Sequence, residues 1–139
     1  MGSIHSILIC LIVSISDGDT ISARCDDQTI KIRLSEIDAP EKGQPFGQKS
    51  KQNLSDICFQ QQAEIKTLTM DRYGRTVARV ICNGTDANAQ QVQSGMAWAF
   101  TKYLKDPKIK EYELTAKNNN IGLWSDPSPT PPWEWRHNK

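Results

Sequence analysis

The first 35 residues alternate short β-branched segments with turn residues, and this pattern limits the fold more than any other part of the sequence. Residues 7–15 form an apolar run rich in Ile, which is typical of a strand buried on both faces or nearly so. Asp17 and Gly18 follow, and this pair favours a tight turn with positive φ. Residues 20–25 and 29–35 then alternate apolar and polar side chains. We therefore expect three antiparallel strands in a meander.

The remaining sequence predicts two more strands and three helices. Strands are expected over residues 64–69 and 76–82, and helices over residues 48–60, 88–94 and 107–119. Five short strands with a helix after the third indicate a five-stranded barrel of the OB type, an α+β fold that is mainly β. No stretch of the sequence resembles a linker, so residues 1–139 are expected to form one domain.

The C-terminal residues differ in composition from the rest. Residues 126–132 contain four prolines, and we expect them to be irregular. Residues 125–139 would then form a Pro/Trp-rich tail in which Trp133 and Trp135 lay the chain against the barrel. Trp124, just before the tail, is expected to pack in the core.

Composition restricts the class of protein but not its substrate. With 37% apolar and 24% charged residues, the 139-residue chain is typical of globular proteins. A net charge of +1 neither supports nor excludes a nucleic-acid partner. Residues 7–13 form the longest apolar run, far shorter than the roughly 20 residues that a membrane helix needs. The run also lacks the basic residues and cleavage site of a signal peptide, so the leader of an exported protein would lie outside this sequence.

Four cysteines, Cys10, Cys25, Cys58 and Cys82, contain no C-x-x-C pair and therefore do not indicate a zinc site. An even number in a small domain favours two disulfides and an oxidising compartment, which predicts a secreted or periplasmic protein. Four buried thiols in a cytoplasmic protein are the alternative. The spacing leaves the pairing open, because four cysteines allow three arrangements.

Charged residues recur where the predicted strands end. Asp19 lies in the first turn, Arg33 on the outward face of the third strand, and Asp38 and Glu41 just after that strand, while Arg75 precedes the fifth. Carboxylates and guanidiniums gathered at one rim of a barrel would be stabilised by a bound cation and a bound anion. Hard cations prefer oxygen ligands, and arginines bind phosphate with planar, permanently charged donors. This pattern therefore predicts a cation-assisted phosphodiesterase, with Asp17 expected only to fix the turn.

Four motifs, in this order and spacing, resemble the staphylococcal (micrococcal) nuclease family, whose members include the thermonuclease-like domains. The motifs are Asp17-Gly18-Asp19-Thr20, Ile32-Arg33-Leu34, Ile37-Asp38-Ala39-Pro40-Glu41 and Asp71-Arg72-Tyr73-Gly74-Arg75. The resemblance runs from Cys10 to Trp135, and the C-terminal residues are similar to those of the Gram-negative members. Each motif alone occurs by chance, whereas four in register are specific.

The resemblance implies a calcium-dependent nuclease that hydrolyses DNA and RNA, with single strands preferred, and leaves 3′-phosphates. Asp19 and Asp38 would bind Ca²⁺ through their side chains, and Ala39 through its carbonyl. Glu41 would orient or deprotonate the attacking water. Arg33 and Arg75 would clamp the phosphate.

Substrate contacts are expected from two further groups of residues. Lys42, Arg72 and Tyr73 are candidates for contacts to neighbouring phosphates. Where the staphylococcal enzyme has tyrosines, this chain has Trp98 and Phe100, with Tyr103 slightly later, so base stacking is expected there. No membrane and no obligatory protein partner is predicted.

A catalytically inactive OB module that binds nucleic acid or protein is the alternative function. Inactive modules of the wider family characteristically lack carboxylates or arginines of the site. This chain keeps all of them, and the sequence therefore favours the enzyme.

Overall fold

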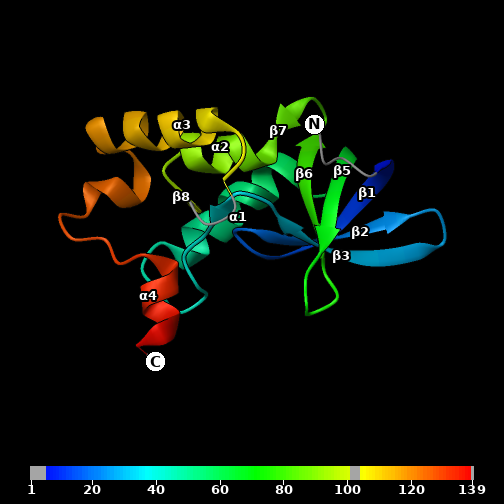
Figure 1. Cartoon of the computed structure of the whole chain (residues 1–139), viewed down its shortest axis with the longest axis horizontal. Helices are drawn as coiled ribbons and strands as arrows, with labels where there is room; N and C mark the ends of the chain where they lie inside the picture. Colours follow the sequence, from blue (N-terminus) through cyan, green and yellow to red (C-terminus); the bar gives the residue numbers. More distant parts are fainter. Residues whose placement is uncertain (1–5, 101–103, 139) are drawn as a thin grey trace.

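The computed structural model describes residues 6–100 and 104–138, and its centre is a five-stranded barrel (Figure 1). The strands are β1 (Ser6–Asp17), β2 (Thr20–Cys25), β3 (Gln28–Leu34), β5 (Gln62–Met70) and β6 (Thr76–Cys82). They are hydrogen-bonded in the order β3-β2-β1-β5-β6, and a parallel pairing of β3 with β6 closes the barrel. The predicted OB-type barrel is confirmed.

Three short strands complete the sheets. β4 (Ile37–Asp38) pairs with β8 (Trp98–Ala99) in a small antiparallel sheet, and β7 (Thr85–Asp86) pairs with β6. The β4–β8 pair brings the segment that carries Asp38 next to the segment that carries Trp98. It therefore joins the predicted metal ligand to the predicted stacking residue.

The expectation that β1 is buried on both faces is wrong. Cys10 and Ile12 are buried, but the side chains of Ile7 and Ile9 are 55% and 64% exposed. A barrel strand turns alternate side chains inward, so only one face of β1 reaches the core. The apolar run is thus an amphipathic strand whose outer face is also apolar.

Three helices lie together on one side of the barrel, to the left in Figure 1. They are α1 (Gly47–Cys58), α2 (Ala87–Gln93) and α3 (Pro107–Asn118), and their positions confirm the three predicted helices. α2 and α3 each begin at a capping aspartate: the side chain of Asp86 accepts a hydrogen bond from the N–H of Ala89, and that of Asp106 accepts one from the N–H of Lys108. Within the described ranges, no helix is long and apolar enough to cross a membrane.

One core connects the barrel and the helical layer. Ile32 and Leu34 of β3 and Leu54 of α1 are fully buried in it. Two disulfides, Cys10–Cys25 and Cys58–Cys82, stabilise its edges, and the second joins the end of α1 to the end of β6. The structure thus contains the two predicted disulfides and settles the pairing that the spacing left open.

The C-terminal tail is more regular than its prolines predict. After a single 3-10 turn, η2 (Gly122–Ser125), the chain is extended and then forms a fourth helix, α4 (Pro132–His137). Pro132 lies in the first turn of α4, where its missing N–H removes no hydrogen bond. The prediction of only three helices is therefore wrong by this short one, which lies below the helical layer in Figure 1. Trp124 of η2 packs in the core as expected.

Candidate active site

The turn between β1 and β2 carries Asp19 and is held by buried contacts. Asp17 accepts a hydrogen bond from the N–H of Asp19 at 3.0 Å, the turn-fixing contact predicted for it. Gly18 does not have the predicted positive φ. Glycine is required at this position for another reason: a Cβ would collide with Ser50 of α1. The side chain of Gln91 in α2 donates to the carbonyl of Gly18 at 2.7 Å.

Asp19 and Asp38 form a buried acidic pair around one guanidinium. Nη2 of Arg33 lies 3.5 Å from a carboxylate oxygen of each aspartate. Nη1 of Arg33 donates to the carbonyls of Leu34 and Ile37 at 2.6 and 2.9 Å, which fixes the side chain. Arg33 is therefore locked between two of the predicted metal ligands.

Backbone and hydroxyl donors orient Asp19. Its Oδ2 accepts from the N–H of Ala39 at 2.8 Å, and its Oδ1 accepts from the hydroxyl of Thr20 at 3.0 Å. The first of these bonds joins the β1–β2 turn to the segment after β4. The structure thus brings Asp19, Asp38 and the backbone of Ala39 together, as predicted.

The charges at this rim perturb one another. Burial, together with the charge of Asp19, raises the pKa of Asp17 to about 7. Burial also opposes ionisation of Asp19, but Arg33 and the hydrogen bonds hold the pKa of Asp19 below its ordinary 3.8. Burial and the charge of Asp19 raise the pKa of Asp38 above that value, although two arginines oppose the shift. Asp38 is thus a buried carboxylate that needs positive charge beside it.

Arg75 lies on the loop between β5 and β6, directly before the part of β6 that pairs with β3. Its Nε donates to Asp71 at 2.7 Å, and Asp71 also accepts the N–H groups of Tyr73 and Arg75. Among the described residues, no hydrogen bond or ion pair joins Arg75 to Asp19, Asp38 or Glu41. The structure therefore does not place the second predicted phosphate clamp in contact with the first.

The predicted substrate residues fall into an exposed group and a packed group. Lys42, Arg72 and Tyr73 are exposed, and the Arg72 guanidinium stacks 5.1 Å from the Tyr73 ring. The rings of Trp98 and Phe100 lie 5.5 and 5.9 Å from the ring of Trp133. Tyr103 lies outside the described residues.

Arg136 of α4 is a site residue that the sequence did not reveal. Its Nη2 donates to Asp38 at 2.6 Å, and its Nη1 donates to Asp38 at 3.2 Å and to Glu41 at 2.6 Å. Asp38 and Arg136 are 98 positions apart, and no local pattern links them. The available signals were the resemblance of the C-terminal residues to those of the Gram-negative members of the family and the position of Arg136 next to Trp135.

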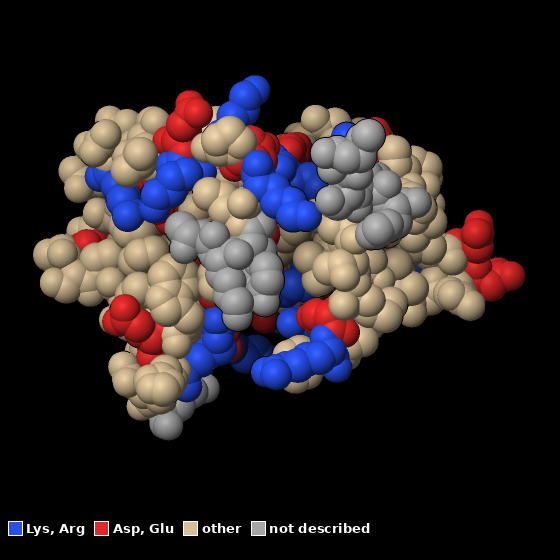
Figure 2. Space-filling model, in the orientation of Figure 1, with Lys and Arg blue, Asp and Glu red and all other residues tan. Residues whose placement is uncertain are grey.

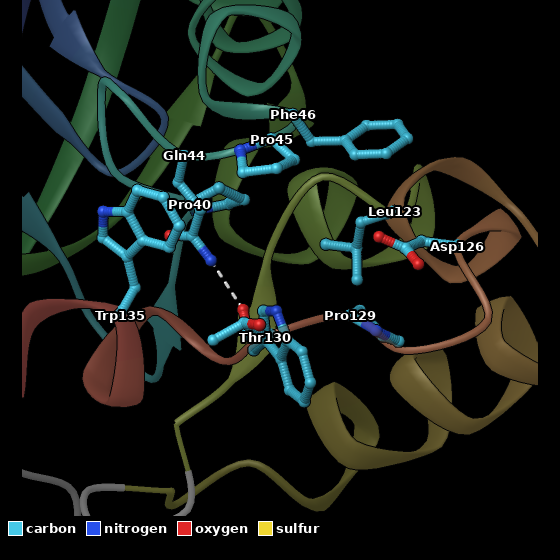
Figure 3. Close-up of a pocket in the computed structure, with 10 residues that line it drawn as sticks. Pro40, Gln44, Pro45, Phe46, Leu123, Asp126, Pro129, Thr130 and Trp135 are labelled. Carbon is cyan, nitrogen blue, oxygen red and sulfur yellow. Dashed lines mark hydrogen bonds between the residues drawn. The ribbon is translucent and has the colours of Figure 1, made fainter. Parts of the chain in front are cut away.

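Gln44 connects the segment of Glu41 to the tail (Figure 3). It accepts from the N–H of Glu41 at 2.9 Å and donates to the carbonyl of Thr130 at 2.6 Å. Beside this link lies a cavity of about 60 Å³, lined by Pro40, Phe46 and Trp135 among others. It is far smaller than the roughly 300 Å³ of a typical small-ligand pocket. A nucleobase would therefore have to bind outside it.

The oxygen donors at this rim fit a hard cation such as Ca²⁺. Asp19 and Asp38 supply carboxylates, and the backbone of Ala39 lies beside them. Within residues 6–100 and 104–138, no three His, Cys, Asp or Glu side chains converge as a metal site. Side chains would thus provide only part of the coordination, and water and substrate would provide the rest.

On the face shown in Figure 2, basic and acidic side chains are interspersed, and neither sign dominates. Binding of a polyanion would therefore depend on local groups such as Arg33, Lys42 and Arg72.

Comparison with known proteins identifies the family. A family model described as "Staphylococcal nuclease homologue" matches residues 31–126. The chain is 44% identical over 136 residues to "Micrococcal nuclease" of Shigella flexneri, covering 90% of this chain and 78% of the relative. It is also 44% identical over 128 residues to an "Uncharacterized endonuclease" of Haemophilus influenzae, covering 91% and 72%. It is 36% identical over 109 residues to "Staphylococcal-like nuclease CAN1" of Arabidopsis thaliana, covering 78% of this chain and 34% of the relative. This protein belongs to the staphylococcal nuclease family.

Proposed function

We propose that the protein is a Ca²⁺-dependent phosphodiesterase that hydrolyses DNA and RNA with little sugar specificity and leaves 3′-phosphates. The observation that carries the proposal is the position of Arg33, locked between Asp19 and Asp38 on the rim where Glu41 also lies. The fixed guanidinium can bind the phosphate anion, and the two oriented carboxylates beside it can bind the cation.

Asp19, Asp38 and the carbonyl of Ala39 would hold the Ca²⁺. When bound, the ion would polarise the phosphodiester and offset the negative charge that grows on its oxygens. Hydrogen bonds to Asp19 from Thr20 and Ala39 keep its carboxylate in one orientation. Two carboxylates and one carbonyl are few ligands for Ca²⁺, so we expect a dissociation constant of about 10⁻⁴ to 10⁻³ M for the free enzyme.

Glu41 is proposed as the residue that orients or deprotonates the attacking water. Its side chain is one-third exposed, so water can reach it once Arg136 is displaced. Arg33 would bind the equatorial phosphate oxygens. Its two hydrogen bonds to backbone carbonyls hold the side chain in position for this contact. Neither Arg33 nor Arg75 can donate a proton at neutral pH, so the leaving 5′-oxygen would take its proton from water.

Arg75 would add a second set of donors from the β5–β6 loop. Only its Nε is used in the ion pair with Asp71, and no other described residue bonds its Nη atoms. Asp71 therefore orients the side chain and leaves the fork of the guanidinium for phosphate.

Single-stranded nucleic acid is the substrate that fits the aromatic residues best. Bases of a single strand can stack on Trp98 or Phe100, with Tyr103 as a further candidate, whereas paired bases cannot. Lys42, Arg72 and Tyr73 would contact the neighbouring phosphates from exposed positions. No obligatory protein partner is proposed.

A secreted or periplasmic location is proposed, and the two disulfides support it. Disulfides form and persist in oxidising compartments and are rare in the cytoplasm. A cytoplasmic location remains the alternative.

The proposed role of Glu41 is tested by digestion of single-stranded DNA and RNA in millimolar Ca²⁺. Glu41→Gln should lower the rate by about 10²- to 10⁴-fold. Glu64→Gln is the matched control, because Glu64 is an exposed carboxylate of β5 that makes no contact with the site, and its rate should equal that of the wild type. A wild-type protein that binds but does not digest either substrate would instead be the inactive OB module.

A further inference from the structure

Arg136 occupies the acidic side chains that the proposed reaction needs. It bonds both carboxylate oxygens of Asp38 and one oxygen of Glu41. Asp38 is fully buried in the docked structure, in which the Arg136 guanidinium lies against both of its carboxylate oxygens. A guanidinium bonded to these oxygens repels a cation and fills the space that it would need, and a Glu41 paired with a guanidinium is a weak acceptor for a water proton.

The same helix covers the aromatic residues proposed to stack the bases. The Trp133 ring lies 5.5 Å from the Trp98 ring and 5.9 Å from the Phe100 ring. Trp133 thus takes the position beside these rings that a base would need. The Arg136 guanidinium on the carboxylates thus takes the place of the cation, and the Trp133 ring takes the place of a stacked base.

Three features of α4 favour its release from the rest of the protein. The helix has six residues and no side-chain cap at its N-terminus, and helices of this length are unstable without tertiary contacts. Arg136 is 41% and Glu41 32% exposed, so solvent screening weakens the ion pair between them, whereas the pair with buried Asp38 is screened less. Nε1 of Trp135 is buried without a hydrogen-bond partner among the described residues, which is an unfavourable feature of the docked helix.

We propose that α4 is an autoinhibitory element: docked, it blocks the cation ligands with Arg136 and the stacking rings with Trp133, and a nucleic-acid strand with Ca²⁺ displaces it. The inference rests on the proposed function and adds regulation to the same site. Displacement requires that cation and strand together bind the open form more tightly than the docked form.

Two binding measurements test this on Arg136→Gln, Arg136→Lys and the wild type. The first is the anisotropy of a labelled oligothymidylate in chelator, and the second is calorimetric titration with Ca²⁺ alone. Arg136→Gln should bind both ligands about fivefold more tightly, because the docked state no longer competes. Arg136→Lys, which keeps the charge but not the fork, should lie between the two. The control Arg24→Gln removes an exposed arginine at the far end of the β2–β3 hairpin.

The sign of the oligonucleotide result is decisive. Loss of a positive charge alone weakens binding to a polyanion, and Arg24→Gln should show only that effect. Tighter oligonucleotide binding by Arg136→Gln supports autoinhibition, and equal or weaker oligonucleotide binding overturns it, whatever the Ca²⁺ titration gives.

Digestion by the wild type separates this inference from the proposed function. If the wild type digests the substrate in a calcium-dependent way but Arg136→Gln does not bind the oligonucleotide more tightly, the proposed function stands and autoinhibition is refuted. If Arg136→Gln binds the oligonucleotide more tightly but the wild type digests nothing, autoinhibition stands and the nuclease function is refuted. If Arg136→Gln fails to fold, hydrogen exchange at the amides of Trp135 and Asn138 in the wild type decides instead: oligonucleotide with Ca²⁺ should speed exchange at both amides, and unchanged protection would contradict the inference.

Discussion

Gln91 of α2 donates its side-chain N–H to the carbonyl of Gly18 at 2.7 Å, so a buried amide of the helical layer holds the turn that carries Asp19. The same nitrogen donates to the carbonyl of Ser50 in α1, and the amide oxygen accepts from Asn53. The helical layer therefore helps to position Asp19, although none of the helices α1–α3 contributes a carboxylate to the acidic pair.

Replacement of Gln91 should destabilise the protein and lower its activity. Gln91→Leu leaves the buried carbonyl of Gly18 without its donor, and we expect a loss of about 1–3 kcal/mol in the free energy of unfolding. Gln93→Leu, an exposed position on the same helix, should change it by less than about 0.5 kcal/mol. Urea denaturation measures both, and equal stability of the two variants would refute this role of Gln91.

Addition of one methyl group at Gly18 should also be unfavourable. The Cβ of Gly18→Ala would collide with Ser50 and approach Ala39, and we expect a cost of about 1–3 kcal/mol in unfolding free energy. Gly43→Ala is the matched control, because a Cβ there meets no atom within 4 Å. Thermal denaturation of the two variants checks this, and a fully stable Gly18→Ala protein would show that the helix can move away.

The ion pair of Asp71 predicts a pH dependence of the β5–β6 loop. Burial opposes ionisation of Asp71, but the hydrogen bonds from Arg75 and Tyr73 together outweigh it and lower the pKa of Asp71 below 3.8. A carboxylate with a lowered pKa stabilises the folded loop above the ordinary pKa, and this contribution is lost as the pH falls through the lower value. NMR titration of the Asp71 carboxyl carbon should give a midpoint below 3.8. A midpoint at or above 3.8 would mean that the loop contacts do not persist in solution.

Asp71→Asn should then reduce activity more than stability. The amide still accepts one hydrogen bond but no longer pairs with the Arg75 guanidinium, so Arg75 loses its orientation. We expect digestion about tenfold slower with only a small change in urea denaturation, because the pair is partly exposed and lies in a loop. A digestion rate equal to that of the wild type would exclude a contribution of this ion pair.

Sequence patterns predicted the barrel well because its strands are local and amphipathic. The alternation of Ile30, Ile32 and Leu34 gives the inward face of β3, and the structure buries Ile32 and Leu34 completely. β1 was harder, since apolar residues on both faces of a strand do not reveal which face the barrel leaves open. The positive φ expected at Gly18 was wrong because a glycine can serve close approach instead of an unusual backbone conformation.

The candidate site was predictable only where its residues lie near turns. Asp19, Arg33 and Asp38 come together through neighbouring strand ends, which a meander dictates. Arg136 could not be placed, because its position depends on how a proline-rich tail returns across the barrel. The ion pair of Arg75 with Asp71 could not be predicted either, since sequence spacing does not say whether an arginine side chain contacts the site or a residue of its own loop.

Weak binding of Ca²⁺ follows from the small donor set. Calorimetry of the free protein should give a dissociation constant of about 10⁻⁴ to 10⁻³ M, and Asp19→Asn should weaken it at least tenfold. Submicromolar binding without nucleic acid would mean that further residues complete the coordination.

The central claim, a metal-assisted nuclease, is tested most directly by digestion of end-labelled single-stranded DNA by the wild type in millimolar Ca²⁺ and in excess chelator. We predict digestion to fragments ending in 3′-phosphate with Ca²⁺ and a loss of at least about 10³-fold in rate with chelator. Undiminished digestion in chelator, or none in Ca²⁺, would contradict the account.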